Sequence, residues 1–266
     1  MANETERRRW NDEQTVANWP KRERFTDRVV PHVVAALKPA PGDKVLDIGS
    51  GGGKLSLAIA QLVQPGGKVV GADISSGMVR MATERAAEAK AKGVTFVAAD
   101  VQSETVAGGP FDGATSQFGV MFFDDPVAAF GNIRRQLKPG GQIAFACWQP
   151  AARNVWNPVP PLAPFVPAPT LLAGKSPTGP FALGDARRTR GILSAAGFRN
   201  ITRTPKRMVL WMPSDVIAND SQLLAVPEDR REAAKKAMTE YFDQFRRDDG
   251  LCRFELNFQI FTAARG

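Results

Sequence analysis

Short apolar segments alternate with helical segments between residues 44 and 148, and this alternation constrains the fold more than any other feature of the sequence. Turns rich in glycine and proline, such as Pro65-Gly66-Gly67, separate the segments. Strands that alternate with helices at this pace predict a parallel sheet with helices on both faces. The expected strands are residues 44–48, 68–72, 94–98, 113–117 and 142–148. The expected helices are residues 54–63, a helix from a cap at Ser75 or Ser76 to about Lys92, and residues 126–137.

Both flanks of this central region differ from it. Residues 1–40 form a predicted helical arm, because apolar residues such as Val29, Val33 and Leu37 recur at helical spacing. Residues 151–266 open with a proline-rich stretch, which predicts an irregular lid because proline lacks the N–H that a packed helix needs. The rest is expected to contain helices over 185–196 and within 214–247, and strands over 200–212 (interrupted at Pro205) and 253–262. We therefore expect one domain made of an arm (1–40), an α/β core (41–150) and a lid with the remaining strands (151–266).

Charge and composition narrow the classes of partner. The net charge is +8, but the basic residues are mostly spread out and no aromatic and basic module accompanies them, so nucleic acid is not an expected partner. The two cysteines, Cys147 and Cys252, are too few for a disulfide framework and lack the spacing of zinc ligands, so no metal site is expected. No apolar run of about 18 residues or apolar signal segment is present. These features predict a cytoplasmic protein without a membrane span, and they leave a homodimer open.

The segment from Val45 to Gly53 carries the most specific signal for a ligand site. A strand ends in Asp47 and runs into a loop with glycine at positions 49, 51 and 53, directly before a helix. Glycine lets the backbone turn sharply and lets a ligand approach closely, and the helix start offers free N–H groups. The dinucleotide fingerprint would place a glycine at position 54, where this chain has Lys54, so a nicotinamide dehydrogenase is disfavoured.

Two further acids support a ligand site at the same edge of the sheet. Asp73 follows the second strand, about 20 residues beyond the glycine loop, where Rossmann-type sites place the carboxylate that binds ribose hydroxyls. Asp100 follows the third strand. Each acid alone would more simply be a turn or cap residue, but the ordered set of three beside the glycine loop favours ligand binding at the carboxyl ends of the strands.

These residues resemble the class I S-adenosylmethionine-dependent methyltransferases, in the branch of methyltransferase domains 11 and 25 that includes UbiE-like proteins. The Leu137-Lys138-Pro139-Gly140-Gly141 turn is a further mark of this branch. The resemblance implies a Rossmann-like, doubly wound sheet of seven strands with the last strand antiparallel. It also implies S-adenosylmethionine as cofactor and S-adenosylhomocysteine as product. The residues expected to bind the cofactor are Asp47, Gly49, Ser50, Gly51, Gly53, Asp73, Ile74, Met78, Asp100, Val101, Ser116 and Gln117.

Apolar residues at the end of the fourth strand predict the wall of a substrate pocket. In the family this strand end faces the methyl group, and here it is followed by a run rich in phenylalanine and methionine. Tryptophans of the arm and of the proline-rich stretch are expected covers, although each would also serve as ordinary packing. The candidates are Trp10, Trp19, Phe118, Met121, Phe122, Trp148 and Trp156.

No catalytic base stands out. His32, the one histidine, lies in an apolar helix and is expected to be structural, and Tyr241 is distant in sequence. Cys147 is expected to be a buried thiol, and Asp124 or Asp125 to cap a helix. Holding a nucleophile in line with an activated methyl group can supply much of the rate. The predicted function is methyl transfer to a small, apolar or aromatic molecule; the alternatives are an RNA or protein methyltransferase and a non-catalytic scaffold with this fold.

Overall fold

The computed structural model describes residues 3–154, 159–166, 178–214, 223 and 226–266. The helices are α1 (Glu4–Asn11), α2 (Glu13–Thr26), α3 (Val30–Leu37), α4 (Lys54–Leu62), α5 (Ser76–Glu88), α6 (Pro126–Gln136), α7 (Val159–Leu162), α9 (Ala186–Ala195) and α11 (Arg231–Asp243). Short 3-10 turns are η1 (Asp27–Val29), η2 (Val120–Phe122), η3 (Ala151–Arg153) and η5 (Glu228–Arg230). The strands are β1 (Lys44–Ile48), β2 (Lys68–Asp73), β3 (Val94–Ala98), β4 (Phe111–Gln117), β5 (Leu137–Trp148), β6 (Phe198–Met212) and β7 (Cys252–Arg265). None of the described helices is long and apolar enough to cross a membrane.

The strands form a seven-stranded sheet in the order β3-β2-β1-β4-β5-β7-β6. The first five pair in parallel, and β7 runs antiparallel to both β5 and β6. This confirms the predicted doubly wound sheet with its last strand antiparallel. The order reverses between β1 and β4, and the carboxyl ends of strands on either side of such a switch point form a crevice. The expected ligand residues therefore meet at one edge of the sheet.

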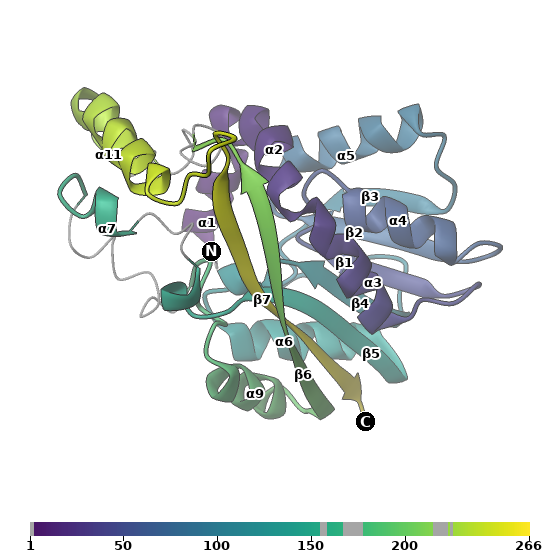
Figure 1. Cartoon of the computed structure of the whole chain (residues 1–266). Coiled ribbons are helices and arrows are strands. Elements are labelled where there is room, and N and C mark those ends of the chain that lie inside the picture. Colours follow the sequence, from purple (N-terminus) through teal and green to yellow (C-terminus); the bar gives the residue numbers. More distant parts are fainter. Residues whose placement is uncertain (1–2, 155–158, 167–177, 215–222, 224–225) are drawn as a thin grey trace.

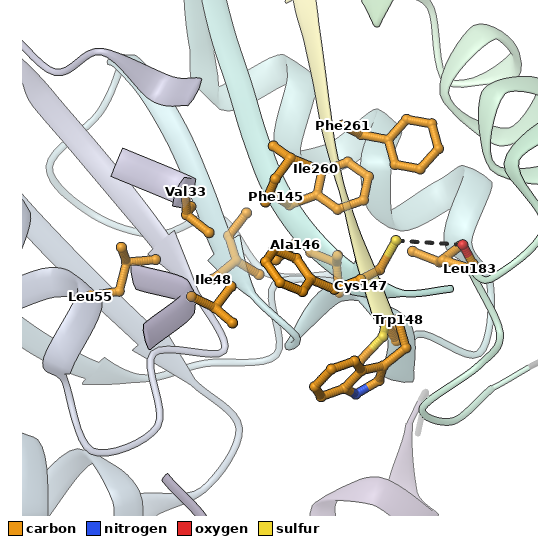
Figure 2. Packing of buried hydrophobic residues seen from close by; sticks show 14 of the residues in the cluster. Val33, Ile48, Leu55, Phe145, Ala146, Cys147, Trp148, Leu183, Ile260 and Phe261 are labelled. Atoms are coloured by element: carbon orange, nitrogen blue, oxygen red, sulfur yellow. Dashed lines mark hydrogen bonds between the residues drawn. The ribbon is translucent and has the colours of Figure 1, made fainter. Parts of the chain in front are cut away.

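Helices cover both faces of the sheet, as expected from strands that are apolar at consecutive positions. Figure 1 shows α3, α4 and α5 on one face and α6 with α9 on the other. In β5 the run from Ile143 to Cys147 is fully buried. Figure 2 shows Cys147 pointing toward Leu183, whose carbonyl accepts its thiol hydrogen at 3.5 Å, while Trp148 points away from Leu183. Cys147 is thus the buried thiol that the sequence predicts, and burial raises its pKa to about 12.

The helix after β2 ends earlier than predicted. It stops at Glu88 rather than near Lys92, because Lys90 adopts a left-handed conformation with φ of 49°. The N–H of Ala91 then donates to the carbonyl of Ala86, and that of Lys90 to Ala87. This is the hydrogen-bond pattern of a Schellman motif, in which glycine is the usual left-handed residue. The prediction placed the helix end at Gly93, because glycine is the usual left-handed residue. In the structure Lys90 occupies the left-handed position instead, so the helix ends earlier.

Two strands also differ from the prediction. Pro205 does not interrupt β6, which runs from Phe198 to Met212 and pairs Pro205 with Gln259. Because β6 is the edge strand, its proline removes no hydrogen bond to a further neighbour. Strand β5 begins at Leu137, opposite Phe111, so it includes the glycine turn that was expected to precede it. The register shifts between Phe111 and Gly113, which accommodates this irregular start.

Candidate functional site

The glycine loop lies between β1 and α4, and its conformation requires glycine. Gly49 and Gly51 have φ of 64° and 52°, in the left-handed region that side chains disfavour. A Cβ at position 49 would lie 2.8 Å from the Cα of Gly119, in the loop after β4. A Cβ at position 51 would lie 2.5 Å from the Trp19 ring of α2. The loop is therefore closely packed by the β4 loop on one side and by the N-terminal arm on another.

Asp47 and Ser50 bring two unpaired polar atoms to this loop. Asp47 is 1 % exposed, and its Oδ2 accepts a hydrogen bond of 2.6 Å from the Ser56 hydroxyl. Its Oδ1 and the Ser50 hydroxyl are buried without a hydrogen-bond partner among the described residues. Burial raises the pKa of Asp47 to about 7; the Ser56 hydrogen bond opposes this shift, and the nearby Asp73 charge adds to it. Buried polar atoms without partners are rare and suit a ligand that would satisfy them.

Asp73 connects the end of β2 to the glycine loop. Its Oδ2 accepts from the N–H of Gly51 at 2.8 Å, and its Oδ1 accepts from the N–H of Ser75 at 2.9 Å. The carboxylate is buried, which raises its pKa, while the two N–H groups act in the opposite direction. A carboxylate has about four acceptor positions, so two remain for ligand hydroxyls.

Asp100 lies after β3, in contact with the arm. Its Oδ1 accepts from the N–H of Gln102 at 3.1 Å, and its side chain also interacts with Asn3 and with the charge of Arg7. Burial is the largest influence and raises its pKa. Of the other residues expected here, Val101 and Met78 are 4 % and 1 % exposed. Met78 is thus enclosed in the protein, and whether it borders a bound ligand stays a prediction.

Ser116 and Gln117, at the end of β4, are already engaged within the chain. The Ser116 hydroxyl donates to the carbonyl of Ile48 at 2.7 Å and accepts from the N–H groups of Gly119 and Val120. This bonding ties β4 to β1 and leaves the hydroxyl little capacity for a ligand. Gln117 donates to the carbonyl of Thr26 at 2.9 Å, whereas its side-chain oxygen is buried and unpaired within the described part of the chain.

The expected pocket residues form two aromatic groups. Trp10 contacts Trp19 and Phe122, with ring centroids 6.0 and 5.2 Å apart. Phe118 stacks on Trp148 at 4.0 Å with an interplanar angle of 11°. Phe118 has a φ of 63°, which is rare for a bulky residue and accompanies functional sites often enough to be informative. Met121 is 2 % exposed and belongs to the core, and Trp156 lies outside the described residues.

The sequence did not reveal which residues hold the arm over this edge of the sheet. Asn11 donates to the carbonyl of Ile74, and its side-chain oxygen accepts from Ser76. Glu23, 5 % exposed, pairs with Arg85 at 2.8 Å, and Arg85 also donates to the carbonyl of Gly52. The arm residues lie more than 60 positions from these partners in the sequence, so no local pattern could identify the contacts.

Comparisons with known proteins identify the family of this chain. A methyltransferase domain model matches residues 39–155. Nocamycin O-methyltransferase of Saccharothrix syringae is 31 % identical over an alignment of 205 residues, and the match covers 71 % of this chain and 71 % of that protein. The chain belongs to the class I S-adenosylmethionine-dependent methyltransferases.

Other relatives of this methyltransferase are consistent with the UbiE-like branch. The demethylmenaquinone methyltransferase of Thermus thermophilus is 36 % identical over 122 residues, or 46 % of this chain and 54 % of that protein. The solved structure of YcgJ from Bacillus subtilis superposes with a TM-score of 0.63 at 19 % identity, covering 90 % of this chain and 98 % of that one. The [4+2]-cyclase SpnF superposes with a TM-score of 0.58 at 20 % identity, covering 90 % and 81 %. The fold is therefore shared with a protein named for a different reaction.

The methyl donor of this methyltransferase is S-adenosylmethionine, and the residues present fit it. The unpaired atoms of Asp47 and Ser50 suit its ammonium and carboxylate groups, and the free acceptor positions of Asp73 suit its ribose hydroxyls. Asp100 with Val101, and Met78, lie at the positions where the resemblance places the adenine contacts. These individual assignments remain predictions.

Proposed function

We propose that this methyltransferase methylates a small apolar or aromatic molecule. The observation that carries the proposal is the stacked pair of Phe118 and Trp148 at the carboxyl ends of β4 and β5. The loop that bears Phe118 packs directly against the glycine loop through Gly49 and Gly119. An acceptor held against these aromatic faces would lie beside the cofactor residues.

The chain's own residues would position the methyl donor and the acceptor rather than supply a strong catalytic base. S-adenosylmethionine, when bound, supplies a methyl group on a sulfonium that is a good leaving group. Asp73 and the glycine loop would hold the donor, and the aromatic residues would orient the acceptor and exclude water. Proximity and orientation of this kind can account for much of a rate enhancement. His32 contacts the ring of Phe258 at 5.7 Å and is half-buried in α3, which agrees with a structural role.

The names of the relatives support a small acceptor. One is named for nocamycin and others for demethylmenaquinone. The basic net charge supports the alternative of an RNA or protein substrate, and the likeness to SpnF supports that of a fold used for another purpose. We favour the small acceptor because the aromatic residues Phe118 and Trp148 adjoin the glycine loop.

Transfer of a labelled methyl group tests the proposal. The protein would be incubated with methyl-labelled S-adenosylmethionine and, in separate reactions, with phenols and hydroquinones, with total RNA, or with a protein extract. We expect label only in the small molecules. Label in RNA or protein would overturn the proposal, and cofactor binding without transfer to any acceptor would favour the scaffold.

A variant of the stacked pair Phe118 and Trp148 tests the acceptor site more directly. Phe118→Gly removes the stacking ring and suits the positive φ, so the loop is expected to remain folded. We expect KM for the acceptor to rise at least about tenfold, the size of one lost aromatic contact of ~1.4 kcal/mol. Trp211→Ala, at an exposed aromatic residue of β6, is the matched control and should leave KM unchanged.

A further inference from the structure

A cavity of about 330 Å³ lies on the β6 side of the sheet, away from the glycine loop. It is lined by the segment that follows β5, by the start of α9 and by β6. Gln149 borders this cavity and directly follows Trp148, so the two side chains point to opposite faces of the extended chain. The cavity is thus separate from the stacked pair of Phe118 and Trp148 and from the expected cofactor residues at the ends of β1, β2 and β3.

Two arginines of the cavity are held by buried glutamines. Gln149, 2 % exposed, accepts from the guanidinium of Arg153 at 3.1 Å. Gln259, fully buried, accepts from Nε of Arg203 at 2.6 Å. The side-chain amides of Gln149 and Gln259 are themselves held in place, because the NH2 group of each donates to two backbone carbonyls. Each guanidinium has five N–H donors, so most of those of Arg153 and Arg203 remain for a ligand.

Positive charge is in excess around the cavity. Its lining contains three arginines (Arg153, Arg187 and Arg203) and one carboxylate, that of Asp185. Elsewhere on β6, Arg207 pairs with Glu255, which also pairs with Arg253 of β7. Within the described ranges, by contrast, none of the three cavity arginines forms an ion pair.

Asp185 has a defined role that limits its effect on these charges. Its Oδ1 accepts from the N–H groups of Arg187 and Arg188 and caps α9. These hydrogen bonds and the adjacent arginines lower its pKa. The carboxylate is therefore ionised and partly compensated by the helix start, and its other oxygen can accept a hydrogen bond at the edge of the cavity.

We propose that this cavity binds a small hydroxylated organic anion. The arginines would form charge-assisted hydrogen bonds with its carboxylate or phosphate oxygens, and Asp185 would accept from its hydroxyl group. The volume falls at the lower end of the range for small-molecule sites, roughly 300–1,000 Å³. Arg153 and Arg203 are already positioned by their glutamines, so little ordering is required on binding. The site does not depend on the methyl-transfer proposal.

Calorimetric titration with citrate, and separately with inorganic phosphate, tests this site, with sodium chloride used to hold the ionic strength constant. Citrate carries an alcohol hydroxyl and several carboxylates, whereas inorganic phosphate is a single smaller anion, so we expect saturable binding of both with citrate the tighter. Arg187→Gln and Arg203→Gln should each weaken citrate binding at least about tenfold, as for a lost charge-assisted hydrogen bond. Arg207→Gln, on β6 but paired with Glu255 outside the cavity, should change it less than twofold.

The variants also guard against misfolding. Arg187 is exposed at the start of α9, so its replacement is expected to leave the thermal transition unchanged. Titration with S-adenosylmethionine should be the same in all variants, which separates this site from the cofactor site. The proposal is overturned by the absence of saturable binding in the wild-type protein, or by equal affinities in Arg187→Gln, Arg203→Gln and Arg207→Gln.

Discussion

At the scale of single residues, Asp73 holds the glycine loop, because its oxygens accept two backbone N–H groups, and we propose that the remaining acceptor positions bind the ribose hydroxyls of the cofactor. Asp73→Asn keeps one acceptor oxygen but loses the charge. We expect S-adenosylmethionine to bind at least about tenfold more weakly, a loss of ~1.4 kcal/mol, with the fold retained. Calorimetric titration measures this. Asp112→Asn, at the start of β4, is the control, and equal affinities in the two variants would remove Asp73 from the site.

Asp47 makes a prediction about pH. Burial raises its pKa from the ordinary value of 3.8 to about 7 in the folded protein, so the folded state binds more protons between these values. Stability therefore falls as pH rises from about 4 to 7, and is constant above that range. Asp47→Asn retains an acceptor for Ser56 and removes this penalty. It should be more stable than the wild type at pH 8, by up to about 4 kcal/mol, and equal to it near pH 4.

Urea unfolding of the cofactor-free proteins at both pH values checks the Asp47 prediction. A difference that is independent of pH would mean that ionisation of Asp47 is not its cause. Because the variant is an isostere, a lower stability at pH 8 would also contradict the prediction.

At the scale of elements, the attachment of the N-terminal arm to the rest of the domain can be weakened by a single substitution outside the glycine loop. Glu23 of α2 is a buried charge of this arm, paired with Arg85 at 2.8 Å and near Lys54 at 3.6 Å. Removing one partner of a buried pair leaves the other uncompensated, which costs ~3–5 kcal/mol in fully buried cases. We expect Glu23→Gln to loosen α1 and α2 and to speed trypsin cleavage at Arg22 and Arg24 at least about tenfold.

Glu13→Gln is the matched control for the arm, because Glu13 is exposed at the first turn of the same helix. It should be cleaved at the wild-type rate. Identical cleavage of the two variants would mean that the ion pair does not hold the arm in place.

At the scale of the whole molecule, binding at the cofactor edge should stabilise the domain against unfolding. A ligand at 100 times its Kd adds ~2.7 kcal/mol, which corresponds to a rise in Tm of about 5–8 °C for a domain of this size. S-adenosylhomocysteine should produce this shift and NAD should not, since position 54 is lysine. A thermal scan measures both, and a shift with NAD alone would contradict the cofactor assignment.

The sequence by itself determined the type of sheet and the edge at which the candidate site is proposed. Alternating strands and helices, glycines at 49, 51 and 53, and acids after three strands are local signals, readable over a few residues. They predicted the doubly wound sheet and the buried thiol of Cys147, and the resemblance that they carry implied seven strands with the last antiparallel. Even among local features some failed, because a left-handed Lys90 replaced the glycine that usually ends a helix.

Only the tertiary structure decided which distant residues pack against the segments that carry those signals. Trp19 packs on Gly51, Asn11 reaches Ile74, and Phe118 stacks on Trp148, and each contact joins residues about 30 or more positions apart. It also decided that Ser116 bonds within the chain and that Pro205 lies on an edge strand. The physical reason is that backbone propensity acts between neighbours, whereas packing and buried hydrogen bonds depend on which distant segments the sheet order brings together.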